Sequence, residues 1–254
     1  MRNQRQYRTL VSRRRLSGRP AVALSALASA VLILHTAPAL TAIGPLRRVG
    51  WPGLAGVGIP GGVALTFDDG PDPHGSPAVL AALAELGWSA TFFMLGSQVA
   101  RYPDVARSIA AAGHEIGVHG YRHRNHLLCS PSALRSDLRQ ARDLIADVTA
   151  TAPRWFRPPY GVLSAGSLAA ARDVGLTAVL WTAWGRDWTR TNPEKITSTV
   201  LAGLRERGTI VLHDSDCTST AGSWRNTAQC LPLLAGRLDA QGWQVRTLSK
   251  HLCG

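Results

Sequence analysis

The chain has 254 residues, of which 45% are hydrophobic and 17% are charged, a composition that argues against a disordered protein, a collagen and a coiled coil. Its 28 Lys and Arg residues outnumber its 16 Asp and Glu residues, so the formal net charge is +12. Such a balance would ordinarily favour nucleic acid or an acidic membrane as the partner.

Most of this charge lies before the first acidic residue, Asp68. Seven arginines fall within the first 19 residues, and two more follow at Arg47 and Arg48. Without these nine arginines the net charge falls from +12 to +3, so the body of the chain is only mildly basic. The body contains no helix-turn-helix, zinc finger or aromatic-basic RNA motif, and we therefore predict that nucleic acid is not a partner.

Residues 1–43 have the order of a targeting segment. After the arginines comes an uncharged apolar stretch over residues 21–34, followed by small residues at Ala37-Pro-Ala39, as in a secretory signal peptide. The stretch 21–43 is also long enough for an uncleaved membrane anchor, because about 20 residues span a bilayer. Leading arginines predict a cytoplasmic N-terminus and an exported body in both cases. We expect a secreted or membrane-anchored protein, with membrane contact only through this segment; a basic tail for nucleic acid is the remaining alternative.

Four cysteines are present, and none belongs to a CxxC pair that would suggest a zinc knuckle. Cys217 and Cys230 flank a stretch rich in Ser, Thr and Gly, and a disulfide between them is the favoured pairing. That would leave Cys129 with Cys253 as a second pair. Four unrelated thiols are the alternative.

The body begins after a Gly- and Pro-rich linker, which we predict at residues 44–62. Short apolar runs then alternate with helical patterns. The predicted strands are 63–67, 90–94, 115–118, 154–157, 177–181, 209–212 and 243–248. The predicted helices are 77–86, 103–112, 131–149, 164–174, 193–207 and 226–241.

This strict alternation of strand and helix predicts an α/β domain with a parallel sheet and crossover helices. About seven parallel strands within residues 63–254 suit a single catalytic domain folded as a distorted or incomplete (β/α) barrel. Functional residues of such barrels gather where the strands end and the loops begin.

Polar residues of the kinds used in catalysis do follow five of the predicted strands. They are Asp68 with Asp69, His119 with His123, Arg157 with Tyr160, Asp187 with Trp188, and His213 with Asp214. Because parallel strands end at one edge of a sheet, we expect these side chains to share a single rim.

Asp69, His119 and His123 are candidate ligands of a divalent metal, because one carboxylate and two imidazoles leave coordination positions open for water and substrate. The two histidines are four residues apart, so on one helical turn both rings would face the same way. A lone HxxxH pair is a weak signal, and His126 could compete as a ligand. Asp68 and Asp69 cannot point the same way at an extended strand end. We expect one to bind metal and the other to face the substrate water, with a turn-forming Asp-Asp-Gly as the alternative.

Five segments occur in the order of the motifs of a known family. They are Thr66-Phe-Asp-Asp-Gly-Pro71, His119-Gly-Tyr-Arg-His123, Arg157-Pro-Pro-Tyr160, Arg186-Asp-Trp188 and Ile210-Val-Leu-His213. The chain thus resembles the polysaccharide deacetylases, also called the NodB homology domain or carbohydrate esterase family 4, over nearly the whole body.

The resemblance implies a role for each matching residue. Asp69, His119 and His123 would hold the metal, usually Zn²⁺ in such relatives, with Co²⁺, Ni²⁺ or Mn²⁺ as alternatives. The metal would lower the pKa of the attacking water and polarise the acetyl carbonyl. Asp68 would be the general base, oriented by Arg157.

The remaining motif residues would act on the substrate. His213 would be the general acid that protonates the departing amine, aided by Asp187. The backbone N–H of Tyr160 would stabilise the oxyanion. Trp188 and Leu212 would form the walls of the pocket for the acetyl methyl group.

Two positions depart from the family pattern. Gly120 stands where the second motif usually has Ser or Thr, and Trp184 stands where the fourth motif often has a further Asp. No direct chemical participant is lost, so we expect an altered pocket or substrate preference rather than lost catalysis. Trp184 or Trp224 could stack on sugar faces.

The expected function is therefore a metal-dependent hydrolase that removes N-acetyl groups from the sugars of an extracellular polysaccharide, with cell-wall peptidoglycan favoured by the predicted export. Chitin oligosaccharides or O-acetylated xylan would suit the same machinery, and a non-catalytic carbohydrate-binding homologue is an alternative of another class. A monomer is the default expectation for the oligomeric state.

Overall fold

The computed structural model describes residues 19–253, and the arginines that precede residue 19 lie outside the described residues. The chain separates into two units, one ending at Leu34 and the other beginning at His35. Helix α1 (Arg19–Thr36) takes up the described part of the first unit. The window Ser25–Ala42 has a mean hydropathy of 1.5 and is long and apolar enough to cross a membrane, a criterion that signal sequences also meet.

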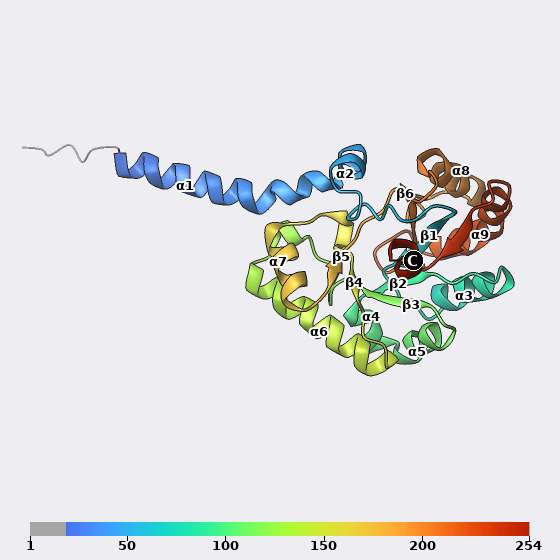
Figure 1. Ribbon diagram of the computed structural model, residues 1–254. Helices are drawn as coiled ribbons and strands as arrows, with labels where there is room; N and C mark the ends of the chain where they lie inside the picture. The colour runs from blue at the N-terminus through green and yellow to red at the C-terminus, as the bar shows by residue number, and fades with distance from the viewer. Residues whose placement is uncertain (1–18, 254) are drawn as a thin grey trace, which may run out of the picture. The chain divides into compact units, whose positions relative to one another are not determined.

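The second unit alternates strands and helices through most of its length (Figure 1). Its strands are β1 (Gly62–Asp68), β2 (Thr91–Met94), β3 (Glu115–Val118), β4 (Trp155–Phe156), β5 (Thr177–Ala178), β6 (Ala183–Trp184), β7 (Thr209–His213) and β8 (Gln244–Arg246). Its α-helices are α2 (Gly44–Gly50), α3 (Gly75–Glu85), α4 (Gly96–Arg101), α5 (Pro103–Ala111), α6 (Pro131–Thr149), α7 (Ala165–Asp173), α8 (Pro193–Gly203), α9 (Ser223–Asp239) and α10 (Leu248–Leu252). Three 3₁₀ turns complete it: η1 (Ala37–Ala42), η2 (His126–Leu128) and η3 (Pro159–Gly161).

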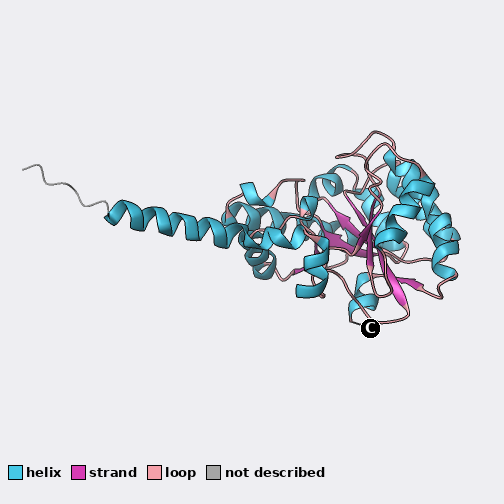
Figure 2. Ribbon diagram, turned by 90° about the horizontal axis from the view of Figure 1, so that it is seen from above, coloured by secondary structure: helices cyan, strands magenta, loops and turns pink. Residues whose placement is uncertain are grey.

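The strands form one parallel sheet in the order β5-β4-β3-β2-β1-β7-β6. The eighth strand, β8, pairs with residues 62–64 of β1, ahead of the point where β2 begins to pair. Figure 2 shows the strands at the centre of the unit and helices on the outside. The predicted α/β class and the incomplete (β/α) barrel are therefore confirmed.

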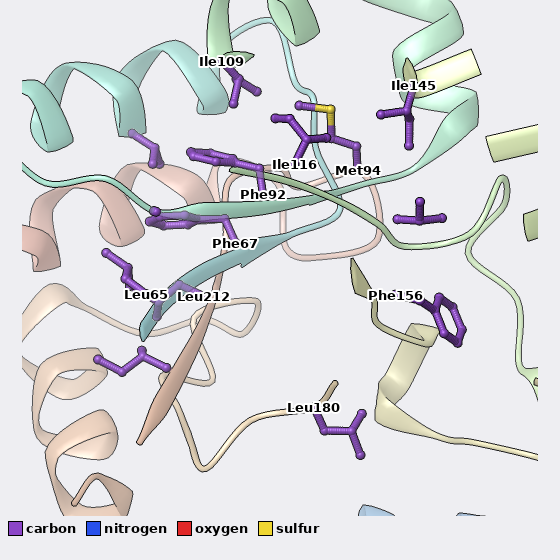
Figure 3. Packing of buried hydrophobic residues seen from close by; sticks show 14 of the residues in the cluster. Leu65, Phe67, Phe92, Met94, Ile109, Ile116, Ile145, Phe156, Leu180 and Leu212 are labelled. Carbon is purple, nitrogen blue, oxygen red and sulfur yellow. The ribbon is translucent and has the colours of Figure 1, made fainter. Parts of the chain in front are cut away.

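The core follows from the two-residue period of the strands. In β1, Val63, Leu65 and Phe67 point to the helices, whereas Thr66 and Asp68 point to the interior of the curled sheet. The rings of Phe67 and Phe92 stack with centroids 5.0 Å apart in the layer between sheet and helices (Figure 3). The interior face thus stays available for polar side chains.

The strand predicted at 177–181 forms only over residues 177–178, and a short strand that was not predicted follows it. Residues 177–178 form β5 on β4, whereas residues 183–184 form β6 on β7, at the opposite end of the sheet. The turn between them leaves the barrel open, and its backbone groups need partners from elsewhere.

Those partners come from residues 37–61, called here the junction segment, most of which had been predicted as a linker. Leu54 O accepts a hydrogen bond from Leu180 N. The buried Arg47 donates to Trp181 O at 2.5 Å, and Arg48 donates to Thr182 O and to Gly203 O. The Gly- and Pro-rich sequence thus forms a folded piece of the second unit rather than a free linker, because it satisfies the open edge of the sheet.

The predicted disulfides are wrong, because all four cysteines are free thiols. Cys230 is buried on the inner face of α9, and burial raises the pKa of its thiol. Cys217 instead lies on the loop after β7, with its Sγ 3.5 Å from the carbonyl oxygen of Asp69. Cys129 and Cys253 are likewise unpaired.

Candidate active site

A cavity of about 310 Å³ lies at the carboxyl ends of the strands, on the interior face of the sheet. It is lined by Asp68, Asp69, His119, His123, Tyr160, Gly161, Trp181, Trp184, Trp188, Val211, His213, Thr218 and Ser219. Most of the residues singled out from the sequence thus meet in one place. Arg157 and Asp187 lie directly behind the lining, each bonded to one of its members.

Both aspartates of the first motif face this cavity because the backbone turns between them. Asp68 ends β1 opposite His213 of β7, whereas Asp69 has a φ of 78°, in the left-handed region that non-glycine residues rarely adopt. The sequence predicted that adjacent aspartates on an extended strand would diverge, and this turn is what brings their carboxylates to one side.

The Asp69 carboxylate lies between two imidazoles. Its Oδ1 is 3.3 Å from His119 Nε2 and 3.5 Å from His123 Nε2. All three potential ligand atoms lie within 4.8 Å of one another. His119 and His123 are not on a helical turn as predicted; they flank a bent loop in which Gly120 has a φ of 94°. A side chain at residue 120 would be strained at this φ, which accounts for glycine in place of the usual Ser or Thr.

This trio fits a divalent cation. His119 Nδ1 is 2.8 Å from the carbonyl oxygen of Arg157, so the ring donates from Nδ1 and turns Nε2 towards Asp69. The buried Asp69 Oδ1 has no hydrogen-bond partner, while Oδ2 accepts from Thr218 at 2.5 Å. Lone pairs of oxygen and nitrogen that face each other across a buried space are what a metal ion satisfies.

The pKa shifts agree with ligands ready to bind. Burial lowers the pKa of His123 to about 4, helped by the nearby His119, so its ring is neutral at pH 7. Burial would raise the pKa of Asp69, but the close approach of the His119 imidazole outweighs burial and holds this pKa well below its ordinary value. The trio thus offers one carboxylate and two imidazoles, which are ligand types that a divalent metal uses, and the ring of His123 is neutral.

Asp68 is paired with a completely buried arginine. Arg157 Nη1 donates to Asp68 Oδ1 at 2.7 Å and to Thr66 Oγ1 at 2.7 Å, while Nη2 donates to Leu180 O at 2.9 Å. The guanidinium also lies over the ring of Phe93, with Cζ 4.1 Å from its centroid. Three fixed hydrogen bonds hold the arginine, and through it one oxygen of Asp68, in a single orientation.

His213 faces the cavity from the opposite side, supported by Asp187. The Asp187 carboxylate accepts from His213 Nδ1 at 3.0 Å, from His213 N at 2.7 Å and from Thr227 Oγ1 at 2.8 Å. Burial alone would lower the pKa of His213, but the charge and hydrogen bond of Asp187 raise it to about 10. Nδ1 is held by Asp187, so Nε2 is the ring nitrogen left for the cavity.

Aromatic rings form the remaining wall. Trp188 meets His213 edge to face with centroids 5.2 Å apart, and Trp184 packs against Trp188 at 5.1 Å. Tyr160, at a φ of 61°, packs against His123 at 4.4 Å and remains largely exposed. Trp184, the second departure from the family pattern, thus replaces a carboxylate by an indole at the mouth of the cavity, whereas Trp224 does not line it.

One predicted lining residue is wrong. Leu212 is completely buried among the residues that contact the helices, and Val211 lines the cavity instead. Side chains alternate along a strand, so the residue that shares a face with His213 is two positions before it, not one. The same count would have identified Val211 from the sequence. Thr218 and Ser219 were also missed, because nothing in their Ser- and Thr-rich loop marks which residues turn inwards.

Comparisons with known proteins agree with this geometry. The family model for polysaccharide deacetylase matches residues 58–179. A chitooligosaccharide deacetylase of Bradyrhizobium sp. (strain ANU 289) is 36% identical over 194 residues, which are 73% of this chain and 88% of that protein. The crystal structure of the Bc1960 peptidoglycan N-acetylglucosamine deacetylase matches with a TM-score of 0.74 and 27% identity, covering 82% of this chain and 97% of that one. BA3943 of Bacillus anthracis, described as a pseudoenzyme of family CE4, matches with a TM-score of 0.69 and 26% identity over 76% of this chain and 65% of that one.

Proposed function

The chain belongs to the polysaccharide deacetylase family, carbohydrate esterase family 4, and from this premise we propose that it is a metal-dependent N-deacetylase of an extracellular glycan, with peptidoglycan as the favoured substrate. The observation that carries metal dependence is the unsatisfied Asp69 Oδ1, which faces the nitrogens of His119 and His123. Hydrolysis of an acetamide needs an activated water, a base, an acid and a site for the oxyanion, and the cavity offers a group for each.

Asp69, His119 and His123 would hold the metal, and Zn²⁺ is the favoured ion because one carboxylate with two imidazoles is a common set for catalytic zinc. Co²⁺, Ni²⁺ and Mn²⁺ accept the same donors. When bound, such an ion supplies Lewis acidity and lowers the pKa of water. Thr218, through its hydrogen bond to Asp69 Oδ2, and the Arg157 carbonyl, through His119 Nδ1, would fix the orientation of two of the ligands.

Asp68 would be the general base. Its Oδ1 is held by Arg157, and the carboxylate lines the cavity beside Asp69. A carboxylate held in this place can accept a proton from the attacking water. Arg157 is in this view a positioning residue, since it is completely buried and reaches the substrate only through Asp68.

His213 would be the general acid, with Asp187 as its positioning residue. A pKa raised by Asp187 keeps the imidazole protonated at neutral pH, and Nε2 is free to give its proton to the departing amine. The backbone N–H of Tyr160 would stabilise the oxyanion from the opposite wall. Trp188 and Val211 would contact the acetyl methyl group beside His213.

The choice of glycan follows from where the protein acts. The apolar window at Ser25–Ala42, after a basic leader, favours an exported body, secreted or membrane-anchored, which would meet the cell wall first. Relatives are named for chitooligosaccharides and for peptidoglycan, so oligomers of N-acetylglucosamine are the second candidate.

Acetate release tests the proposal. Peptidoglycan and N-acetylglucosamine oligomers are incubated with the protein, with a chelator, and with chelator followed by added Zn²⁺. We expect release that the chelator stops and Zn²⁺ restores, with peptidoglycan preferred. Glycan binding without acetate release from either substrate, unchanged by Asp69→Ala, would instead identify a non-catalytic carbohydrate-binding homologue.

A further inference from the structure

The junction segment presents a row of apolar side chains to solvent. Leu40, Ile43, Leu46 and Val49 are three residues apart and are 55%, 53%, 44% and 86% exposed, and Trp51 follows at 49%. Leu46 and Val49 are one turn apart on α2, and Leu40 and Ile43 precede them in η1 and at its end. Isolated exposed apolar residues are ordinary, but a continuous row of this kind marks an interaction surface.

The opposite side of the same segment is fixed to the sheet. The buried Arg47 donates to Thr41 O and to Trp181 O, both at 2.5 Å, and its guanidinium lies 5.4 Å from the ring of Trp181. Gly58 N donates to Arg207 O at 2.8 Å, and Ile59 N donates to His251 O at 2.9 Å. Both arginines of the segment thus point inwards, and the apolar row carries no charge among its members.

The exposed apolar row overlaps the end of the membrane-length window and continues directly after it in the sequence. The window Ser25–Ala42 ends one residue before Ile43 and three residues before Pro45 in the first turn of α2. Thr41, inside the window, is already buried, and its carbonyl is held by Arg47. Because α2 begins two residues after the window ends, a chain that crosses a bilayer within this window brings α2 close to the membrane surface.

From the exposed apolar row and its position directly after the membrane-length window, we propose a membrane contact of the catalytic unit. Ile43, Leu46, Val49 and Trp51 insert into the interface of the extracytoplasmic leaflet and hold the catalytic unit directly on the bilayer. The occupant of the surface is the lipid itself. The apolar side chains match the acyl boundary, and a tryptophan at the end of the row is the residue favoured at headgroup level. The inference rests on the membrane-anchored form of the proposed export, in which the N-terminal segment is retained, but not on the deacetylase activity.

Site-specific photo-crosslinking of the full chain tests this docking. The photoreactive residue p-benzoylphenylalanine replaces Val49, Leu27 or, as a matched control, Leu233. Leu233 lies on α9 and is an apolar residue with an exposure similar to that of Leu46. Each protein, with its N-terminus shown by mass to be intact, is reconstituted in vesicles of phosphatidylethanolamine and phosphatidylglycerol and irradiated. We expect phospholipid adducts at positions 27 and 49 in comparable amounts and none above background at position 233.

The other outcomes overturn the proposal. An adduct at position 27 alone would mean that the catalytic unit stands clear of the bilayer. No adduct at position 27 would mean that the window does not cross it, and adducts at all three positions would mean adsorption without a defined face. Acetate release is measured on the same three proteins: if release fails while the adducts appear as expected, the deacetylase proposal fails and the docking remains. Val49 is the most exposed residue of the row, so its replacement should leave the fold intact.

Discussion

The two sides of the cavity differ in how far the protein satisfies its own buried charges. Asp187, on the acid side, accepts three hydrogen bonds from His213 and Thr227. Asp69, on the metal side, is equally buried, yet its Oδ1 faces two imidazole nitrogens and has no hydrogen-bond partner. The Asp187 carboxylate beside His213, the proposed acid, is thus satisfied as folded, whereas Asp69, a proposed metal ligand, has an oxygen that a bound cation would satisfy. Changes on the two sides should accordingly differ in kind.

Removal of the metal-side carboxylate should have the largest effect. Asp69→Ala removes the only anionic ligand, and losing several kcal/mol of charge stabilisation corresponds to a fall in kcat/KM of roughly a thousandfold or more. The variant should also lose the increase in Tm that Zn²⁺ gives the wild type. The matched control is Thr218→Val, which removes only the hydrogen bond to Asp69 Oδ2 and should weaken metal affinity by about 10–100-fold. Wild-type acetate release from Asp69→Ala in the presence of chelator would refute metal dependence.

A substitution beside His213 should change the pH dependence of kcat and leave metal binding unchanged. Asp187→Asn removes the charge that raises the pKa of His213, so the imidazole would be mostly neutral at pH 8 and kcat there should fall by about 10²–10⁴-fold. A bound cation also repels the imidazolium, so we expect the alkaline limb of the wild-type profile below pH 10 but above 6.5. In Asp187→Asn this limb should move to lower pH, while Zn²⁺ affinity measured by chelator competition stays unchanged. A limb at the same pH in both proteins would show that His213 is not the acid.

The sequence predicts this division only in part. The spacing of the motifs identified Asp68, Asp69, His119, His123 and His213, because catalytic residue types directly after strands are a local signal. The sequence could not reveal that Asp69 turns into a left-handed φ, or that a bent loop rather than a helical turn brings the two histidines together. Such backbone choices depend on tertiary contacts.

The same limit applies to the fold. Strand–helix alternation predicted the parallel sheet, since its period is written along the chain. It did not predict that the strand at 177–181 would end at residue 178, that a further strand at residues 183–184 would pair at the other end of the sheet, or that residues 44–61 would cover the opening. Arg47 and Arg48 lie in a segment whose glycines and prolines are typical of a linker. Only the acceptors at Trp181 and Thr182, more than 130 residues later, explain the two arginines.

Trp184 should affect substrate binding more than chemistry. Its indole lines the mouth of the cavity and contacts Trp188 without touching His213 or the metal trio in the contacts described. Trp184→Ala should raise KM for peptidoglycan roughly three- to tenfold, as expected for losing a stacking contact of about 0.5–1.5 kcal/mol, with kcat little changed. Trp224→Ala is the matched control, because Trp224 does not line the cavity. A fall in kcat at constant KM would instead place Trp184 in the chemical step.

His126 should not affect metal binding at all. Its ring is buried, stacks on Phe156 with centroids 5.8 Å apart and lies 3.2 Å from Ser167 Oγ, outside the trio around Asp69. His126→Leu should therefore leave Zn²⁺ affinity and kcat unchanged, and Ser167 keeps its hydrogen bond to Ser164 N. A tenfold loss of Zn²⁺ affinity would make His126 a ligand and contradict the trio.

The change expected in His126→Leu is in stability against pH. Burial lowers the pKa of His126 to about 4, so between pH 6.5 and 4 the unfolded chain binds a proton that the folded chain does not. The contribution of His126 to the free energy of unfolding is therefore fully present above pH 6.5. It decreases as the pH falls, by about 2 kcal/mol at pH 4.5. Urea unfolding of both proteins with chelator, at pH 7 and pH 4.5, measures it. The wild type should lose more free energy of unfolding than His126→Leu by about that amount, because the leucine has no proton to gain; equal losses would mean that His126 is already charged in the folded protein.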